Sequence, residues 1–267
     1  MSLTPVVAHT MLHMWEEPCI SGKNGSGAIF FSGCSLGCVF CQNWEISHKN
    51  FGKEISVERL AEIFYELEQK GAHNINLVNP THYAYSIVEA LKIYKPSIPV
   101  VYNSGGYDTV DTIRMLNGYI DIYLMDFKYF SSEKSAKYSL SENYVQIAQS
   151  CILECIKQTG ETVIDSNGLM KKGVIIRHLV LPSATSETIK IIDWVKTNSP
   201  ETFLSIMSQY TPFGNAYNFK ELSRKITFRE YNKVLNYLID SDLKNVYVQE
   251  LSSSNKEYVP IFTLSGI

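Results

Sequence analysis

The sequence predicts an α/β fold, namely an open partial (β/α)6 barrel with a parallel sheet and outer helices. Two observations support this prediction. Short apolar runs and amphipathic stretches alternate in six βα steps, as expected for parallel strands joined by helical crossovers. Polar residues gather directly after the apolar runs, where the ligand sites of such folds lie. Because six units are fewer than the eight of a closed barrel, we expect an open sheet.

The first half of the chain supplies three of these units. "GAIFFSG" (27–33) is an apolar run ending in glycine, which indicates a buried strand. The stretch 56–72 places its apolar residues on one helical face, begins at a serine N-cap and ends at a glycine. The elements that follow are a strand at 74–80, a helix at 83–94, a strand at 98–106 and a helix at 109–118.

The second half continues the alternation. An apolar strand at 120–130 precedes a longer helix at 141–160, which Gly160 ends. Residues 161–182 predict a hairpin that turns at 166–168 and leads into a strand. The remaining elements are a helix at 186–197, a strand at 202–212, a helix at 227–242 and a short strand at 244–250.

This unbroken alternation predicts a single domain over residues 1–267. Residues 28–250 form its barrel core, and residues 1–27 are expected to be an N-terminal extension packed on the barrel. No linker or low-complexity tract divides the chain, and the helices lie between strands. A division into two domains would therefore cut through βα units.

Composition and charge exclude several classes of function. The net charge of −3 offers no basic stripe of the kind that binds nucleic acid. No apolar run approaches the ~18 residues needed to cross a membrane, and "MSLTPVVAHT" (1–10) lacks the basic flank and apolar core of a signal peptide. We therefore expect a cytoplasmic protein, in which clustered cysteines are more often metal ligands or redox groups than disulfides.

Polar side chains follow each expected strand at the point where it ends. Because the carboxyl ends of parallel strands meet at one edge of a sheet, these side chains are expected to assemble one site. They are Cys34, Cys38, Cys41, Asn79, Thr81, Asn103, Ser104, Asp126, Lys128, Arg177 and Gln209. Arg177 stands among valine and isoleucine, so it needs an anionic partner, which is either a ligand or an internal carboxylate.

Three of the six cysteines, Cys34, Cys38 and Cys41, lie within eight residues directly after the first expected strand. Cysteine thiolates are the usual ligands of iron–sulfur clusters, and a 4Fe–4S cluster normally takes four of them. Three cysteines leave one iron open, and an open iron can bind a small molecule through an amine and a carboxylate. The missing fourth cysteine thus predicts a reaction site rather than a simple electron-transfer centre.

Two other interpretations of these cysteines stay open. Structural zinc wants four ligands, and Cys19 or His48 would complete the set. Cys19 would equally close a cluster and make an electron-transfer protein, although a packed structural thiol is the simpler reading. Cys151 and Cys155 lie one helical turn apart and need no role beyond that of buried small hydrophobes.

The cysteine spacing resembles the signature of the radical S-adenosylmethionine (SAM) enzymes, C-x3-C-x-aromatic-C, which Cys34, Cys38, Phe40 and Cys41 meet. The surrounding stretch "EEPCISGKNGSGAIFFSGCSLGCVFCQNWEIS" is similar to the group related to pyruvate formate-lyase activating enzyme. The resemblance implies a 4Fe–4S cluster and SAM as cofactors. In this chemistry the reduced cluster cleaves SAM to a 5′-deoxyadenosyl radical, which abstracts a hydrogen atom from the substrate.

The same resemblance implies partners. A flavodoxin or ferredoxin-type protein would supply the electron, and the substrate would be a glycyl radical enzyme or another protein. Modification of a small molecule is the alternative within radical chemistry, and a non-catalytic iron–sulfur or zinc module is the alternative outside it. The rim of the site is expected to consist of the polar segments 49–56, 130–137 and 211–219.

The resemblance also implies individual roles. Where the family has a G-G-E-P-like turn for the SAM amine, this chain has "VNPTH" (78–82), which lacks the acidic residue. "IIRHLVLP" (175–182) resembles the stretch whose arginine meets the SAM carboxylate. The residues implied to bind or line the cofactor site are Phe40, Asn79, Thr81, Asn103, Ser104, Asp126, Lys128, Arg177 and Gln209.

Overall fold

A computed structural model describes residues 4–251 and 261–267 of the chain, so residues 1–3 and 252–260 of the expected single domain lie outside the described part. Nine of the described strands form one path in the order β10-β9-β8-β6-β5-β4-β2-β1-β3, and β7 pairs with β8. The strands are β1 (Val6–His13), β2 (Ser26–Phe31), β3 (Lys53–Glu54), β4 (Ile75–Val78), β5 (Val100–Ser104), β6 (Ile122–Asp126), β7 (Val163–Ile164), β8 (Met170–Leu179), β9 (Phe203–Met207) and β10 (Val246–Val248).

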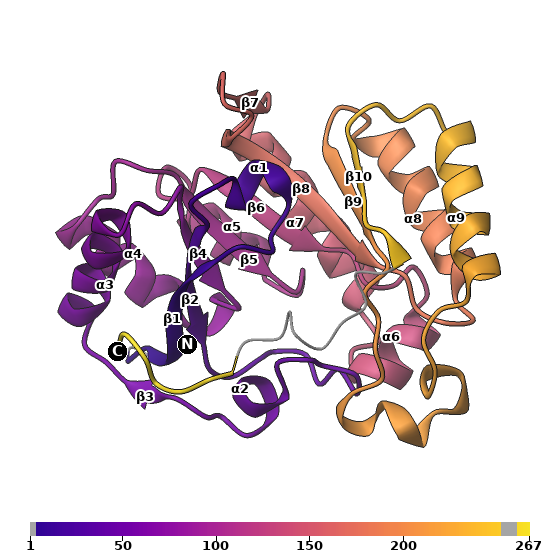
Figure 1. The fold of residues 1–267 in the computed structure, drawn as a ribbon, viewed down its shortest axis with the longest axis horizontal. Helices are drawn as coiled ribbons and strands as arrows, with labels where there is room; N and C mark the ends of the chain where they lie inside the picture. The colour runs from indigo at the N-terminus through magenta and orange to yellow at the C-terminus, as the bar shows by residue number, and fades with distance from the viewer. Residues whose placement is uncertain (1–3, 252–260) are drawn as a thin grey trace.

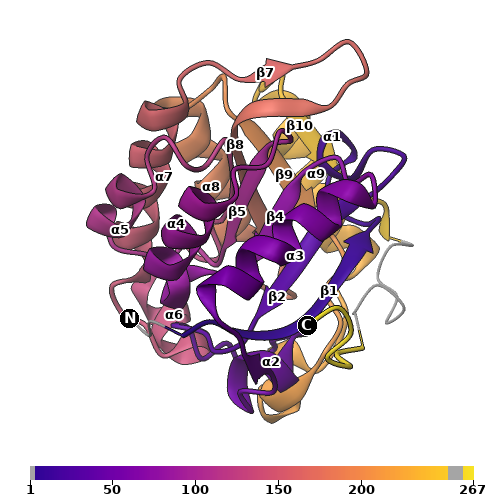
Figure 2. The same cartoon turned by 90° about the vertical axis from the view of Figure 1, so that its left-hand side faces the viewer.

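The helices cover the outer face of this sheet, as Figure 2 shows for α3, α4, α5 and α7. The α-helices are α1 (Pro18–Ser21), α2 (Trp44–His48), α3 (Val57–Gln69), α4 (Ala84–Ile93), α5 (Val110–Met115), α6 (Ser132–Ser139), α7 (Tyr144–Thr159), α8 (Thr185–Asn198) and α9 (Phe228–Asp240). The 3-10 turns are η1 (Thr81–Tyr83), η2 (Gly214–Asn218) and η3 (Lys220–Leu222). The main hydrophobic core lies between the strands and these helices.

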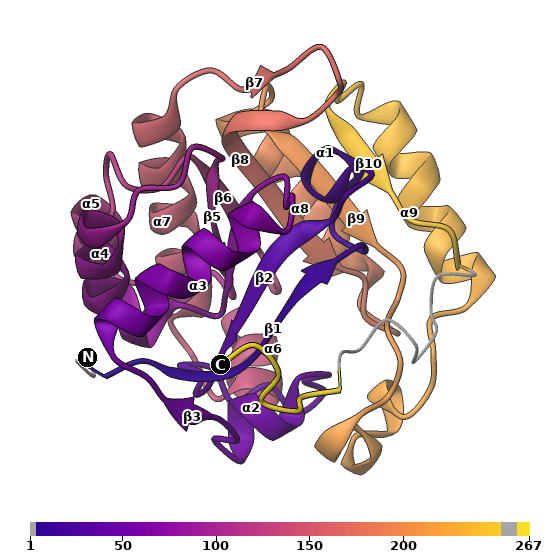
Figure 3. The ribbon, with the colours of Figure 1, turned by 60° about the vertical axis from the view of Figure 1, so that its left-hand side comes forward.

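The six predicted core strands are present and pair in parallel in chain order, β2 with β4, then β5, β6, β8 and β9. The predicted short last strand, β10, adds to β9 in parallel. The sheet curves from β1 round to β10 without closing (Figure 3). The predicted fold class, an open partial barrel, is therefore confirmed.

Part of the N-terminal segment belongs to the sheet. Residues 6–13 form β1, which pairs antiparallel with β2, and β3 pairs antiparallel with β1. No alternation of polar and apolar residues marked 6–13 as a strand, because both sides of β1 are partly covered. The loop that follows β1 carries Glu16 to the carboxyl ends of the parallel strands, where it lines the cavity described below.

The segment 130–137, expected as a rim loop, is mostly helical. Its helix α6 begins after Ser131, whose hydroxyl accepts a hydrogen bond from the Lys134 amide, and ends at Leu140 in the left-handed conformation. The Glu187 carboxylate accepts hydrogen bonds from the amides of Phe130 and Ser131, both at 2.8 Å. These contacts come from α8, far along the chain, so the local serine-rich sequence did not indicate a helix.

The other rim segments also contain short regular elements, β3 in 49–56 and η2 in 211–219. The predicted hairpin at 161–182 is confirmed, since β7 pairs antiparallel with the start of β8. Figure 1 shows α2 and α6 at the same end of the sheet. Within the described residues, no helix combines the length and the apolar character that crossing a membrane requires.

Candidate functional site

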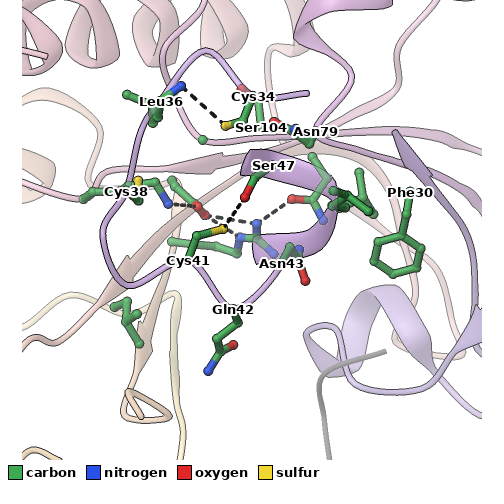
Figure 4. A pocket seen from close by; sticks show the side chains of 18 of the residues that line it. Phe30, Cys34, Leu36, Cys38, Cys41, Gln42, Asn43, Ser47, Asn79 and Ser104 are labelled. Carbon is green, nitrogen blue, oxygen red and sulfur yellow. Dashed lines mark hydrogen bonds and ion pairs between the residues drawn. The ribbon is translucent and has the colours of Figure 1, made fainter. Parts of the chain in front are cut away.

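A cavity of about 280 Å³ lies at the carboxyl ends of the parallel strands. Its lining comes from the loop after β2, from the ends of β4, β5, β6, β8 and β9, and from the segment after β1. Figure 4 shows the cysteine loop with Asn79 and Ser104. Eleven of the twelve site residues expected from the sequence line it, namely Cys34, Cys38, Phe40, Cys41, Asn79, Asn103, Ser104, Asp126, Lys128, Arg177 and Gln209. The six strands therefore bring these separate pieces of chain into one site.

Thr81 is the expected site residue that does not line the cavity. It lies in η1, and its hydroxyl hydrogen-bonds the buried carboxyl group of Asp108. Asn79, two residues earlier, takes the left-handed conformation with φ of 60°. Its side-chain amide donates to the carbonyl oxygen of Gly33, which joins the turn after β4 to the start of the cysteine loop. Asparagine is among the residues that tolerate this backbone conformation best.

The cysteine loop is held by its surroundings as well as by its own turns. Gly33 starts it with φ of 86°, a conformation that favours glycine. The Gly37 and Val39 amides donate to the carbonyl oxygens of Ser139 and Tyr138 at 3.3 and 2.9 Å. The C-terminal end of α6 thus supports the loop that carries the three thiols.

Each of the three sulfur atoms accepts a hydrogen bond. The Sγ of Cys34 is 3.4 Å from the Leu36 amide, the Sγ of Cys38 is 2.9 Å from the Ser139 hydroxyl, and the Sγ of Cys41 is 3.2 Å from the Ser47 hydroxyl. Figure 4 shows Ser47 beside Cys41.

Burial raises the pKa of all three thiols, to about 12 for Cys34. The Lys128 ammonium acts in the opposite direction on each of them. Thiolates form here when further positive charge binds, which is what the irons of a cluster supply. A set of thiols on one loop facing one cavity therefore fits an iron–sulfur cluster.

A row of alternating charges crosses the cavity floor. Arg177 Nη1 lies 3.0 Å from Glu16 Oε2, Arg177 Nε lies 3.0 Å from Asp126 Oδ1, and Lys128 Nζ lies 2.5 Å from Asp126 Oδ2. The exposed fractions of these side chains are 12% for Arg177, 11% for Glu16, 16% for Asp126 and 21% for Lys128. This charged row has two cations and two anions, so it is close to neutral overall.

The contacts within the charged row favour the ionised forms of Arg177 and Asp126. Burial opposes the charge of Arg177, but Asp126, Glu16 and Glu17 outweigh it and raise the arginine pKa above its ordinary value. Burial also disfavours the Asp126 carboxylate, yet Lys128 and Arg177 hold its pKa below the usual range. Arg177 therefore has internal carboxylates as partners, one of the two possibilities that the sequence left open.

Glu16 is a cavity-lining residue that the sequence interpretation missed. Its Oε1 accepts hydrogen bonds from the side-chain amides of Asn76 and Asn103, at 2.9 and 3.1 Å, while its Oε2 meets Arg177. One carboxylate thus connects β4, β5 and β8. The sequence did offer a signal for such a residue. Asn76 and Asn103 each lie inside an apolar strand, and a buried asparagine side chain needs a polar partner.

The remaining cysteines lie away from the cavity lining. Cys19 packs in a separate small core with Ile20, and Cys151 donates to the carbonyl oxygen of Asp108 at 3.1 Å. Among the residues that the structure describes, no three His, Cys, Asp or Glu side chains come together as a site for one metal ion. A cluster makes a different demand, because each of its three cysteines binds a separate iron atom.

Fold and site define a class: a partial parallel barrel with three cysteines and a charged row facing one cavity at the strand ends. Residues 28–195 match the family model of the Radical SAM superfamily. The chain therefore belongs to the radical SAM superfamily.

A curated relative extends the match along the chain. The chain is 33% identical over 246 residues to the uncharacterized protein MJ0674 of Methanocaldococcus jannaschii, an alignment that covers 88% of this chain and 68% of that protein. Membership of the superfamily implies a 4Fe–4S cluster and SAM, and the donor set described above fits both. The narrower group related to pyruvate formate-lyase activating enzyme stays a prediction.

Proposed function

We propose that this radical SAM enzyme holds a 4Fe–4S cluster with Cys34, Cys38 and Cys41 and cleaves SAM reductively to start hydrogen abstraction. The observation that carries the proposal is that three thiols and a partly buried charged row line the same cavity. When bound, the cluster supplies one electron and SAM supplies the radical. The chain's part is to hold both, orient them and exclude water.

Arg177 is the proposed partner of the SAM carboxylate, because its planar guanidinium binds carboxylates through two parallel hydrogen bonds. Glu16 occupies one side of that guanidinium, so the two carboxylates compete for it. Asp126 holds the guanidinium from another side and is held in turn by Lys128. Arg177 is thus fixed in place before a ligand arrives, which lowers the entropic cost of binding.

Asn79, Asn103 and Ser104 are proposed to contact the methionine or ribose part of SAM, and Phe40 and Gln209 complete the wall. Asn103 Oδ1 already accepts a hydrogen bond from Arg177 Nη2 at 2.5 Å, and the Ser104 hydroxyl donates to buried Asp108. Both side chains are therefore oriented by neighbouring side chains, of which Asp108 is buried and Arg177 partly buried. Lys128 is proposed to offset the negative charge of the cysteine thiolates, in line with its effect on their pKa.

A protein glycine is the proposed substrate, as in the activating enzymes that the chain resembles, and a flavodoxin or ferredoxin-type protein is the proposed reductant. Such an oxygen-sensitive cluster suits the reducing cytoplasm. The segments 49–56, 130–137 and 211–219 are proposed to form the rim that a substrate loop passes.

The cluster is tested by anaerobic reconstitution with iron and sulfide, followed by iron counting and by assay of 5′-deoxyadenosine after reduction with SAM present. We expect one cluster per chain and deoxyadenosine release. Cys34→Ala, Cys38→Ala and Cys41→Ala should each lose the cluster. A normal cluster in any one of these variants would remove that cysteine from the site, and absence of SAM cleavage by the intact cluster would overturn the proposed reaction.

The substrate is tested separately by mixing reduced enzyme, SAM and candidate glycyl radical proteins, and by recording EPR spectra. A persistent glycyl signal on the partner is the expected result. If no such protein acquires a radical while a small metabolite stimulates deoxyadenosine release, the substrate is a small molecule and the activating role is wrong.

A further inference from the structure

Two hydrogen-bond chains, one buried and one partly buried, end on the cysteine sulfurs. In the first, the Tyr129 hydroxyl lies 2.7 Å from the Ser139 hydroxyl, which donates to Cys38 Sγ at 2.9 Å. Tyr129 and Ser139 are both fully buried. Ser139 is the last residue of α6, so a helix of the crossover after β6 reaches the loop after β2.

The second chain has the same form on the other side of the loop. His48 Nδ1 lies 2.8 Å from the Ser47 hydroxyl, which donates to Cys41 Sγ at 3.2 Å. The His48 ring stacks on Trp44 with a centroid separation of 3.7 Å and an interplanar angle of 7°. This stacking on α2 holds the imidazole in the position that the hydrogen bond needs.

Counting hydrogens fixes the direction of both chains. A thiolate has no hydrogen to donate, so once the cysteines hold a cluster each serine gives its single hydroxyl hydrogen to the sulfur. The ring group behind it must then be the donor, so Tyr129 gives its hydroxyl hydrogen to Ser139, and His48 carries its hydrogen on Nδ1. Both chains therefore point their donors toward a thiolate. Cys34 differs, because its sulfur meets the Leu36 amide of its own loop at 3.4 Å.

Donors aimed at a cluster thiolate stabilise the more negative, reduced state of the cluster. They also strengthen one another when linked in a chain within a buried site.

We propose that Ser139 and Ser47, supported by Tyr129 and His48, are positioning residues that raise the reduction potential of the cluster at Cys38 and Cys41. The inference rests on the proposed function, since it requires the cluster. Without these donors the same reductant would transfer its single electron to a smaller fraction of the clusters.

The test is an anaerobic titration of the reconstituted full chain with dithionite and redox mediators, without SAM, followed by visible absorption and EPR. At the midpoint potential of the native protein, Ser139→Ala should lower the ratio of reduced to oxidised cluster at least fivefold, which is about 40 mV for a one-electron couple. Ser47→Ala should shift the ratio in the same direction. The matched control is Ser135→Ala, because Ser135 is also a buried serine of α6 but bonds the Ser132 carbonyl oxygen instead.

Iron content is measured first, so that cluster loss is not mistaken for a changed potential. If Ser139→Ala takes up no cluster, Tyr129→Phe decides, because it removes the outer hydroxyl and leaves Ser139 in place. A smaller fall in the ratio in Tyr129→Phe supports the proposal. The proposal is overturned if the reduction potential of the cluster is unchanged, at full iron content, in Ser47→Ala and also in the variant of the other chain. That variant is Ser139→Ala, or Tyr129→Phe if Ser139→Ala takes up no cluster. A native chain that binds no cluster would instead overturn the proposed function.

Discussion

Replacing Arg177 by alanine removes the central cation of the charged row and leaves two carboxylates facing a cavity. The Arg177 and Glu16 side chains are only 12% and 11% exposed, so water screens the remaining charges poorly. Asp126 keeps Lys128 as a partner, whereas Glu16 keeps only the amides of Asn76 and Asn103. Removing one partner of a buried ion pair lowers the free energy of unfolding by about 3–5 kcal/mol, and we expect Arg177→Ala to destabilise the protein by an amount in this range.

The assay is urea unfolding of the cluster-free protein at neutral pH, with Arg224→Ala as the matched control. Arg224 also forms an arginine–carboxylate pair, with Glu230 at 2.7 Å, but its side chain is 41% exposed. Such surface pairs contribute about 0–1 kcal/mol. Adding Glu16→Gln to Arg177→Ala should recover part of the loss, because it removes the charge left unpaired. If Arg177→Ala costs no more than Arg224→Ala, the charged row does not stabilise the fold as argued.

The same variant tests the cofactor role once the cluster is in place. Loss of a charged hydrogen bond to a buried carboxylate costs on the order of 2–5 kcal/mol, so Arg177→Ala should weaken SAM binding at least tenfold. Equilibrium binding to the reconstituted protein measures this, and Arg224→Ala again serves as control. Unchanged SAM affinity would remove Arg177 from the cofactor site.

Three further predictions concern the stability of the fold and the role of Cys19. Burial lowers the pKa of His178 to about 4, below the value of 6.5 in an unfolded chain. The unfolded state therefore binds the proton more strongly than the folded state. The free energy of unfolding should fall by about 3 kcal/mol as the pH drops from 6.5 to 4. Urea titrations across that pH range should show a flatter profile for His178→Asn, and equal slopes in both proteins would refute the assignment. Gly106→Ala should cost at least about 2 kcal/mol, because φ is 80° and a Cβ would overlap the Asp126 carbonyl oxygen. Gly118→Ala, with φ of 83° and nothing within 4 Å, should cost only about 1 kcal/mol, so equal thermal shifts in the two variants would exclude the overlap. Cys19→Ala should keep the full iron content after reconstitution, and loss of iron would make Cys19 a ligand.

The barrel and most of the cavity lining were predictable from two things. Local apolar runs mark the strands, and the carboxyl ends of parallel strands lie at the same edge of a sheet. Apolar runs such as 27–33 and 120–130 mark buried strands without reference to the rest of the chain. Once the strands are parallel, their carboxyl ends meet, so Asn103, Asp126 and Arg177 had to converge. The cysteine spacing added the chemistry.

The missed features depend on contacts between distant segments. Glu16 meets Arg177 across 161 positions of sequence, and Ser139 meets Cys38 across 101. Neither pairing leaves a local periodicity. Helix α6 was missed because its N-terminal backbone is held by Glu187 of α8 rather than by a strong apolar face of its own. Thr81 was expected in the cavity from its place after β4, but η1 directs its hydroxyl to Asp108.

The attachment of the cysteine loop to the end of α6 has a consequence for biosynthesis. All three cysteines leave the ribosome early, but the carbonyl oxygens of Tyr138 and Ser139 that hold their loop belong to a helix made about a hundred residues later. The support of α6 by Glu187 lies later still. A nascent chain that ends before residue 132 therefore carries the thiols without the backbone contacts that hold their loop, so the loop reaches its described conformation only after the later crossovers are made.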